Sequence, residues 1–281
     1  MREIRADRIT EAVSNLFQEA CYQLSADVID ALKKARDVEE SPVARSVLGK
    51  LLENAEISAK GEVPLCQDTG MAVVFLEMGQ DVHIVAGDIN SAVNEGVRRA
   101  YTEGFLRKSV VERPFSDRTN TQDNTPAVIH TFIVPGDRLK ITALAKGFGS
   151  ENMSRLAMLL PAKGRQGIID FVVKTVEESG SNPCPPIIIG VGIGGTVEKC
   201  VLLAKQALLR KVGQPHPDAG VSSLEKDILR QVNKLGIGAM GYGGRITALA
   251  AHVEVFPTHI ASLPVAVNLQ CHSARHKETI L

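Results

Sequence analysis

Tryptophan is absent from the 281-residue sequence, and aromatic residues make up only 4% of it. Lys plus Arg and Asp plus Glu each number 32, so the formal net charge is zero. Proteins that bind nucleic acid rely on basic surfaces and on aromatic side chains that stack on bases. The sequence has neither a positive excess nor a basic run with interleaved aromatics, which argues against a nucleic-acid partner.

Long apolar runs are also missing. No stretch of about 18 apolar residues is present, so no membrane span is predicted. Met1–Arg5 leads directly into an amphipathic pattern that carries acidic residues, which fits neither a signal peptide nor a transit peptide. We therefore expect a cytoplasmic protein. With 44% apolar residues, the chain is long enough to form a sizeable core in one large domain or two small ones.

Cysteine is scarce and scattered. The five cysteines are an odd number without a close CxxC pair, so neither a disulfide framework nor a zinc ribbon is predicted. Cys21 and Cys200 lie on helical apolar patterns, where a small buried thiol is the expected role. Cys66, Cys184 and Cys271 each lie where an apolar strand meets a polar or proline-rich turn.

Those three turns admit two interpretations. Proline at position 64 and on both sides of Cys184 stiffens the backbone, which fixes a thiolate in place. Three isolated thiolates can hold a [4Fe–4S] cluster by three corners and leave one iron open to substrate. The alternative is three structural thiols, and spacing alone does not decide between them.

The stretch Pro64–Gly70 concentrates chemistry. Cys66, Gln67, Asp68 and Thr69 place a thiol, an amide, a carboxylate and a hydroxyl on adjacent positions before an apolar strand. A turn that enters a strand holds reactive side chains on a rigid base, so this stretch is a candidate site, with a well-bonded structural turn as the alternative.

Apolar periodicity and turn residues predict a mixed α/β (α+β) fold, with residues 1–60 mainly helical and packed on a mixed sheet, in a single domain over 1–281. The expected helices occupy two segments of Ile4–Lys34, then Pro42–Gly61, Asp88–Gly104, a segment after Asn152, Gly164–Glu178, Val197–Lys211 and Val221–Leu235. The expected strands are Met71–Leu76, Val82–Val85, Ala127–Val134, Arg138–Leu144, Ile187–Ile189, Thr247–Val255 and Leu263–Leu269. Ala127–Val134 and Arg138–Leu144 should form a hairpin around Pro135–Asp137.

Glycine-rich segments suggest three further functions. Gly190, Gly192 and Gly195 match G-x-G-x-x-G between a strand and a helix, but no acidic strand end follows about 20 residues later, which argues against a nucleotide-binding module. Lys146–Asn152 precedes a predicted helix and suits either an anion site or a turn capped by its serine. In Gly236–Arg245 the backbone should approach another segment closely, and the polar loop Glu112–Pro126 is long enough to be functional.

Four stretches together resemble the class I, iron–sulfur fumarate hydratases. They match the N-terminal domain of the single-chain enzymes, or the α subunit of the two-subunit fumarases and L-tartrate dehydratases, in the right order along essentially the whole chain. Phe148, where a glycine is expected, and Ala239–Met240, where a proline-containing pair is expected, depart from the family pattern. The matching stretches are Cys66–Gly70, Lys146–Asn152, Gly190–Lys199 and Leu269–His272.

The resemblance implies a site and an activity. It implies that the three turn cysteines ligate a [4Fe–4S] cluster held by loops, in an enzyme that reversibly hydrates fumarate to L-malate. Asp68 is the expected proton-transfer residue, or it tunes the group that transfers the proton. The residues implied to contact the dicarboxylate are Gln67, Asp68, Arg107, the backbone of Gly149, and His259.

The resemblance also implies a partner. The chain ends ten residues after Cys271, whereas a second domain follows in the single-chain enzymes, so a separate β subunit should complete the site in an α2β2 assembly or around an α–α dimer. L(+)-tartrate dehydration is the alternative activity. A non-catalytic iron–sulfur subunit that only binds a metabolite is the alternative from another class.

Overall fold

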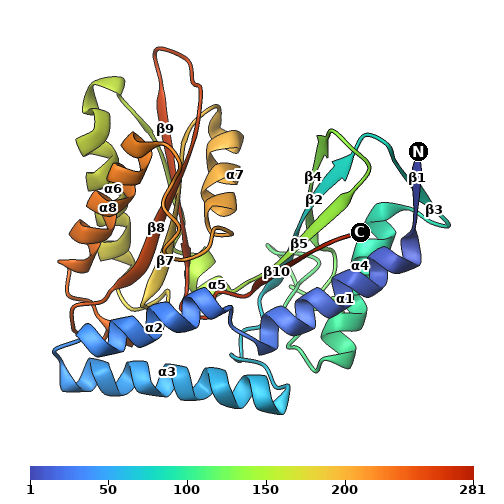
Figure 1. Cartoon of the computed structure of the whole chain (residues 1–281), viewed down its shortest axis with the longest axis horizontal. Helices are drawn as coiled ribbons and strands as arrows, with labels where there is room; N and C mark the ends of the chain where they lie inside the picture. The colour runs from blue at the N-terminus through green and yellow to red at the C-terminus, as the bar shows by residue number, and fades with distance from the viewer. The chain divides into compact units, whose positions relative to one another are not determined.

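The computed structural model describes residues 1–281, which cluster into two compact units built from interleaved segments. Unit 1 comprises Met1–Leu24, Asn54–Phe148 and Arg275–Leu281, and unit 2 comprises Ser25–Glu53 and Gly149–Ala274. Helices and strands mix in both units, which confirms the predicted α/β class (Figure 1). No helix has both the length and the apolarity that a membrane crossing requires.

Unit 1 is a four-stranded mixed sheet covered on one face by two helices. The strand order is β10-β5-β2-β4, and a separate parallel pair joins β1 to β3. The alternate side chains of β2 and β5 that point to the helical face form the core with α1 and α4. The bounds are β1 (Arg2–Arg5), α1 (Ala6–Tyr22), β2 (Met71–Gly79), β3 (Val82–Val85), α4 (Ile89–Glu103), β4 (Val128–Val134), β5 (Leu139–Lys146) and β10 (His276–Ile280).

Two predicted helix starts are confirmed by capping bonds. The Asp88 carboxylate accepts a hydrogen bond of 2.9 Å from the Ser91 N–H at the start of α4. The Ser41 hydroxyl accepts one of 3.3 Å from the Ala44 N–H at the start of α3 (Pro42–Gly61), the helix that leads from unit 2 into unit 1. Both bonds satisfy N–H groups that a helix terminus otherwise leaves unpaired.

The predicted hairpin is wrong. β2 lies between β4 and β5, parallel to the first and antiparallel to the second. The turn at Pro135–Asp137 instead wraps over the end of β2, where the Asp81 N–H donates to the Gly136 carbonyl and the Gly79 N–H to that of Arg138. The apolar β2 buries both of its faces by entering the sheet between them, a long-range preference that local turn chemistry does not reveal.

Unit 2 is a second four-stranded sheet, of order β6-β9-β7-β8, with helices on both faces. α7 covers one face, and α6 and α8 cover the other (Figure 1). The helix expected after Asn152 is wrong, because α5 has only four residues and strand β6 follows it. The bounds are α2 (Ala26–Val38), α5 (Phe148–Glu151), β6 (Arg155–Leu159), α6 (Gly164–Ser179), β7 (Ile187–Gly194), α7 (Val197–Ala207), α8 (Ala219–Asn233), β8 (Ala248–Phe256) and β9 (Leu263–Gln270), with 3-10 turns at Pro161–Lys163 and Ala239–Gly241.

The G-x-G-x-x-G glycines belong to helix packing. Strand β7 continues through Gly190 and Gly192, which were expected in a loop. A Cβ at Gly190 would lie 2.1 Å from the Ala204 carbonyl oxygen, and one at Gly192 would lie 2.0 Å from that of Cys200. Both glycines therefore let α7 pack directly against the strand backbone, which accounts for the motif without a nucleotide.

We expect Gly192→Ala to destabilise unit 2 strongly, because the added methyl group would meet helix backbone that cannot yield locally. The free energy of unfolding should fall by about 3 kcal/mol or more in urea titrations. Gly49→Ala is the matched control: this glycine is in α3, and a Cβ added there would have nothing within 4 Å, so alanine should stabilise by about 1 kcal/mol. Equal effects of the two changes would contradict the packing argument.

Candidate active site

The Cys66–Gly70 turn of unit 1 fixes a carboxylate beside a thiol. The Asp68 side chain accepts hydrogen bonds at both oxygens, from the Gly70 N–H at 3.0 Å and the Phe148 N–H at 2.8 Å. The Asp68 N–H donates to the Cys66 sulfur at 3.4 Å, and the Cys66 thiol lies 3.3 Å from the Gln67 amide oxygen. The turn thus holds the predicted residues Cys66, Gln67 and Asp68 in one small constellation.

This turn is anchored to the rigid start of β2. Gly70 has a φ of +78°, and a Cβ there would lie 2.7 Å from the Lys146 backbone, so only glycine fits. The buried Tyr101 hydroxyl lies 2.8 Å from the Thr69 carbonyl oxygen and 3.1 Å from that of Gly70. Polar side chains at positions 66–68 are therefore presented from a fixed backbone.

Arg275 is a residue of this site that sequence reasoning missed. Its guanidinium donates from Nη1 to the Asp68 carbonyl oxygen, and its own carbonyl accepts from the Ala145 N–H at 2.9 Å. Only 1% of Arg275 is exposed, so a buried charge braces the turn from the start of β10. Its position 207 residues from Asp68 leaves no local signal of this contact.

Arg107 lies beside the same turn. The Thr69 hydroxyl donates to the Arg107 carbonyl at 2.9 Å, while the exposed side chain of Arg107 remains outside the core. Asn124, in the predicted functional loop, is fully buried; it accepts from the Ser109 N–H at 2.7 Å and donates to the Gly70 carbonyl at 3.2 Å. The long polar loop thus holds Arg107 next to the Cys66–Gly70 turn.

Cys184 and Cys271 meet at one end of the sheet of unit 2. Cys184 precedes β7 and Cys271 follows β9, and these strands are antiparallel with Ile188 opposite Gln270. His272 links the two turns, since its ring Nδ1 lies 2.9 Å from the Cys184 carbonyl oxygen. Cys184 has a φ of +55°, an uncommon conformation for a residue with a side chain, and such strain tends to occur at functional sites.

The second glycine-rich loop packs against the Cys184 turn. The Met240 N–H donates to the Pro185 carbonyl at 2.7 Å, and a Cβ at Gly241 would lie 2.4 Å from that of Ser181. The buried Glu39 carboxylate holds the loop by accepting from the Arg245 N–H at 2.9 Å. The predicted close approach of this loop to another segment is confirmed. Met240, which departs from the family pattern, still donates its backbone N–H to the Cys184 turn.

Gly149 also lies at this end of unit 2, where a Cβ would be 3.1 Å from the Asn182 carbonyl oxygen. Because α5 has only four residues, its helix dipole adds little here, and an anion at this stretch would be held by single N–H groups. The Phe148 N–H that would bind an anion already donates to the Asp68 carboxylate.

Gln270, next to Cys271, is a second residue that the sequence did not single out. It is 1% exposed, and its side-chain oxygen has no hydrogen-bond partner, while its amide nitrogen donates to the Ser273 carbonyl at 3.3 Å. An unpaired buried oxygen costs free energy, so it calls for an explanation such as a bound water, ion or ligand.

His259 is not brought to this end of unit 2. It lies in the connection between β8 and β9, exposed, with its Nδ1 3.2 Å from the Ala261 N–H. Cys271 follows the other end of β9. An eight-residue strand spans about 26 Å, which is beyond the reach of a histidine side chain and a small dicarboxylate together.

The remaining cysteines behave as core residues. Burial raises the pKa of the Cys21 thiol to about 11 and that of the Cys200 thiol to about 11, so both stay protonated near neutral pH. Within each unit taken by itself, no three His, Cys, Asp or Glu side chains form a metal site. Of the three turn cysteines, Cys66 belongs to unit 1, and Cys184 and Cys271 belong to unit 2.

His252 is a buried neutral histidine rather than a candidate acid. Burial, and then the nearby Arg210 charge, lower its pKa from 6.5 to about 4. Between these values the unfolded chain binds a proton that the folded chain does not, so the free energy of unfolding should fall by about 3 kcal/mol as the pH drops from about 7 to about 4. The free energy of unfolding, measured by urea titration at several pH values in that range, should fall less steeply with decreasing pH for His252→Gln than for wild type. An equal pH dependence of the two proteins would contradict this.

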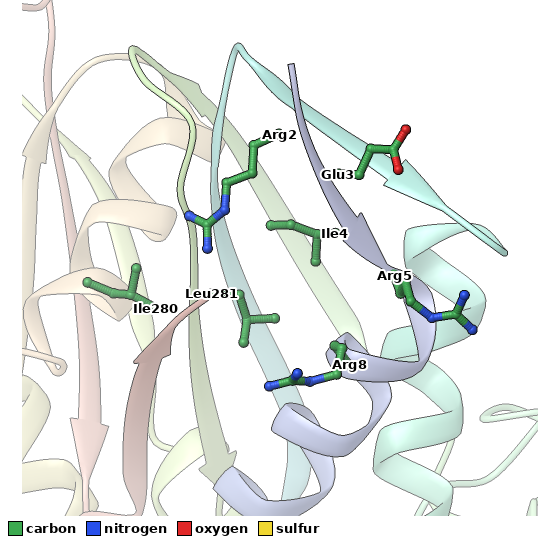
Figure 2. A pocket seen from close by; sticks show the side chains of 7 residues that line it. All are labelled: Arg2, Glu3, Ile4, Arg5, Arg8, Ile280 and Leu281. Atoms are coloured by element: carbon green, nitrogen blue, oxygen red, sulfur yellow. The ribbon is translucent and has the colours of Figure 1, made fainter.

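Two larger cavities lie away from the predicted site residues. One, of about 420 Å³, lies in unit 1 beside β1 and the end of the chain (Figure 2). Its Arg5 points away from Leu281 and pairs with Asp7 at 2.9 Å. Another, of about 480 Å³, lies in unit 2 along α2 and β8. None of the predicted site residues lines either cavity, so neither cavity coincides with the candidate site.

Comparison with known proteins agrees with the resemblance. Residues 10–280 match the family model for fumarate hydratase (fumerase). The chain is 43% identical over 272 residues to a Methanocaldococcus jannaschii protein provisionally named L(+)-tartrate dehydratase subunit alpha, covering 95% of each. It is 30% identical over 273 residues to the L(+)-tartrate dehydratase subunit alpha of Escherichia coli K12 and to that of Shigella boydii serotype 4, covering 96% of this chain and 89% of either relative. The chain belongs to the fumarate hydratase family of hydro-lyases.

Proposed function

We propose that this chain is the α subunit of a [4Fe–4S]-dependent hydro-lyase that reversibly hydrates fumarate to L-malate. The observation that carries the proposal is the turn in which two backbone N–H groups orient the Asp68 carboxylate beside the Cys66 thiol. A fixed carboxylate next to a soft metal ligand is the arrangement that a metal-assisted addition of water to a double bond needs.

The donor set fits an iron–sulfur cluster. Cys66, Cys184 and Cys271 are thiols on turns, a backbone N–H donates to the Cys66 sulfur, and the unpaired Gln270 oxygen lies next to Cys271 in sequence. We assign these cysteines as the three protein ligands of the cluster. Hydrogen bonds from N–H groups to the ligating sulfurs would tune its reduction potential. When bound, the cluster supplies a Lewis acid at the iron that has no cysteine ligand.

The chain's own residues then bind substrate and move a proton. Arg107, whose backbone is fixed beside Asp68, is suited to grip one carboxylate through paired N–H donors. Gln67 orients the substrate, and the Gly149 N–H donates to it. Asp68 takes the proton from C3 of malate in dehydration and returns it in hydration, or holds the group that does so.

In this proposal His259 contributes to the substrate site of a second α chain. Because β9 separates it from Cys271 in its own chain, a role in binding dicarboxylate requires that the histidine reach the site of another α chain. This fits the α–α dimer or α2β2 assembly inferred from the resemblance.

A separate β subunit supplies the rest of the site. The relatives are named as alpha subunits, and this chain covers about nine-tenths or more of their length. We therefore propose that the isolated chain has little activity and that turnover requires the second polypeptide.

L(+)-tartrate is the second candidate substrate, favoured by the names of the relatives at 43% and 30% identity. Both reactions remove water from a four-carbon dicarboxylate, and they differ by one substrate hydroxyl. Anaerobic assays of the αβ complex with L-malate, fumarate and L(+)-tartrate would decide. A larger kcat/KM for malate and fumarate supports the first proposal, a larger value for tartrate supports the second, and turnover of none refutes both.

A further inference from the structure

Two phenylalanines of unit 1 are almost fully exposed. Phe105 is 89% exposed and Phe115 is 94% exposed, whereas Phe17 and Phe75 are buried in the same unit. Aromatic side chains are scarce in this chain and give much hydrophobic free energy when buried, so exposing two of them on one segment is unusual.

Phe105 is held outward by its neighbours. Its φ is +51°, a region that a bulky residue rarely adopts. The preceding Gly104 carbonyl accepts the Tyr22 hydroxyl at 2.8 Å, and the following Leu106 is 3% exposed. Two anchored residues therefore hold Phe105 out in solvent rather than letting it fold back onto the core.

Phe115 lies on a loop tip that has its own internal bonds. The Thr119 hydroxyl donates to the Asp117 carboxylate at 2.9 Å, and the Arg118 guanidinium donates to the Pro114 carbonyl at 2.5 Å. The Glu112 N–H donates to the Thr119 carbonyl at 2.9 Å and closes the loop. Internal hydrogen bonds therefore hold the loop that carries Phe115 in a defined conformation.

Both phenylalanines lie close in sequence to Arg107, the residue that the proposed function assigns to a substrate carboxylate. Phe105 is two residues before Arg107, and the Phe115 loop is joined to the next residues by the bond from the Asn120 side chain to the Lys108 carbonyl at 3.0 Å and by that from the Thr121 N–H to the Val110 carbonyl at 3.0 Å. A polypeptide that covers this segment over Arg107 would therefore meet Phe105 and the base of the loop that carries Phe115.

We propose that Phe105 and Phe115, here called the phenylalanine pair, are anchors that insert into apolar pockets of the β subunit. This rests on the proposed function, because it needs a second polypeptide that completes the site. A second α chain is not the occupant we infer for this pair, because the β subunit is the polypeptide that supplies the rest of the site in the proposed function. Exposed aromatic residues that become buried at the centre of an interface carry much of its free energy.

The test uses the αβ complex, which is purified through a tag on this chain. The complex is identified by an equimolar content of the two polypeptides and by hydro-lyase activity. The dissociation constant of α from β is then measured for wild type, Phe105→Ser and Phe115→Ser by sedimentation. We expect each change to weaken binding about 30-fold or more. Activity at limiting β should fall in parallel and recover at saturating β, and the unfolding of isolated α should be unchanged.

Leu160→Ser, which alters an exposed apolar residue of unit 2, is the matched control and should bind β as wild type does. Binding within about twofold of wild type for both phenylalanine variants would overturn the inference while leaving the activity proposal intact. Loss of α–α association with unchanged binding of β would also overturn it. Wild-type chain that yields neither a second polypeptide nor turnover would remove the proposed function and this inference together.

Discussion

Cys66→Ser, Cys184→Ser and Cys271→Ser should each reduce hydro-lyase turnover of the αβ complex by about a thousandfold or more. Serine keeps the size of the side chain but replaces a soft thiolate ligand with a hydroxyl that binds iron–sulfur clusters poorly. Each of the three cysteines lies on a turn beside a strand end, where no other side chain of its own turn offers a sulfur. Anaerobic steady-state kinetics of the complex measures the loss.

Cys21→Ser and Cys200→Ser are the controls for the same atomic change. Both thiols are fully buried, and a serine hydroxyl at position 200 can still donate to the Gly192 carbonyl, as the thiol does at 3.1 Å. These two variants should retain turnover, with at most a modest loss of stability. A control that lost activity as completely as the turn variants, with its fold intact, would contradict the assignment of the ligands.

Asp68→Asn should lower kcat by about 10²- to 10⁴-fold while cluster content stays near that of wild type. The amide cannot act as a base, and its NH2 group would face one of the two N–H donors, from Gly70 or Phe148, that now orient the carboxylate. Loss of chemistry and loss of orientation thus act together. Iron content and kcat, measured on the same sample, separate this effect from loss of the cluster.

Asp88→Asn makes the same carboxylate-to-amide change at the N-cap of α4. Asparagine caps helices about as well as aspartate, so kcat should be unchanged. If Asp68→Asn kept wild-type kcat, proton transfer would have to be assigned to another group. If it lost the cluster as well, Asp68 would support the Cys66 turn rather than the reaction.

Much of the secondary structure follows from short-range rules. The Ser41 and Asp88 caps and the apolar periodicity of α1, α2 and α6 predict helices that the structure contains. The failures come from longer range. Local turn residues at Pro135–Asp137 favour a hairpin, but β2 separates its two strands, and the glycines of β7 resemble a loop although they lie in a buried strand.

The candidate site divides in the same way. Cys66, Gln67 and Asp68 are adjacent in sequence, so one turn presents them together and the pattern is readable. Arg275 acts on Asp68 from the far end of the chain, and Gln270 is noticeable only because its oxygen is buried without a partner. The Arg275 contact has no signature in residue order because it joins segments far apart in the chain, and the state of the Gln270 oxygen is known only from its burial.

The most direct test of the proposed function is iron and acid-labile sulfide analysis, with EPR spectroscopy, on the αβ complex purified without oxygen. The proposed function predicts about four irons and four sulfides for each α chain in the wild type, and their loss in the Cys66, Cys184 and Cys271 variants but not in those of Cys21 and Cys200. A wild-type complex that turns over substrate and contains no iron or sulfide would contradict it.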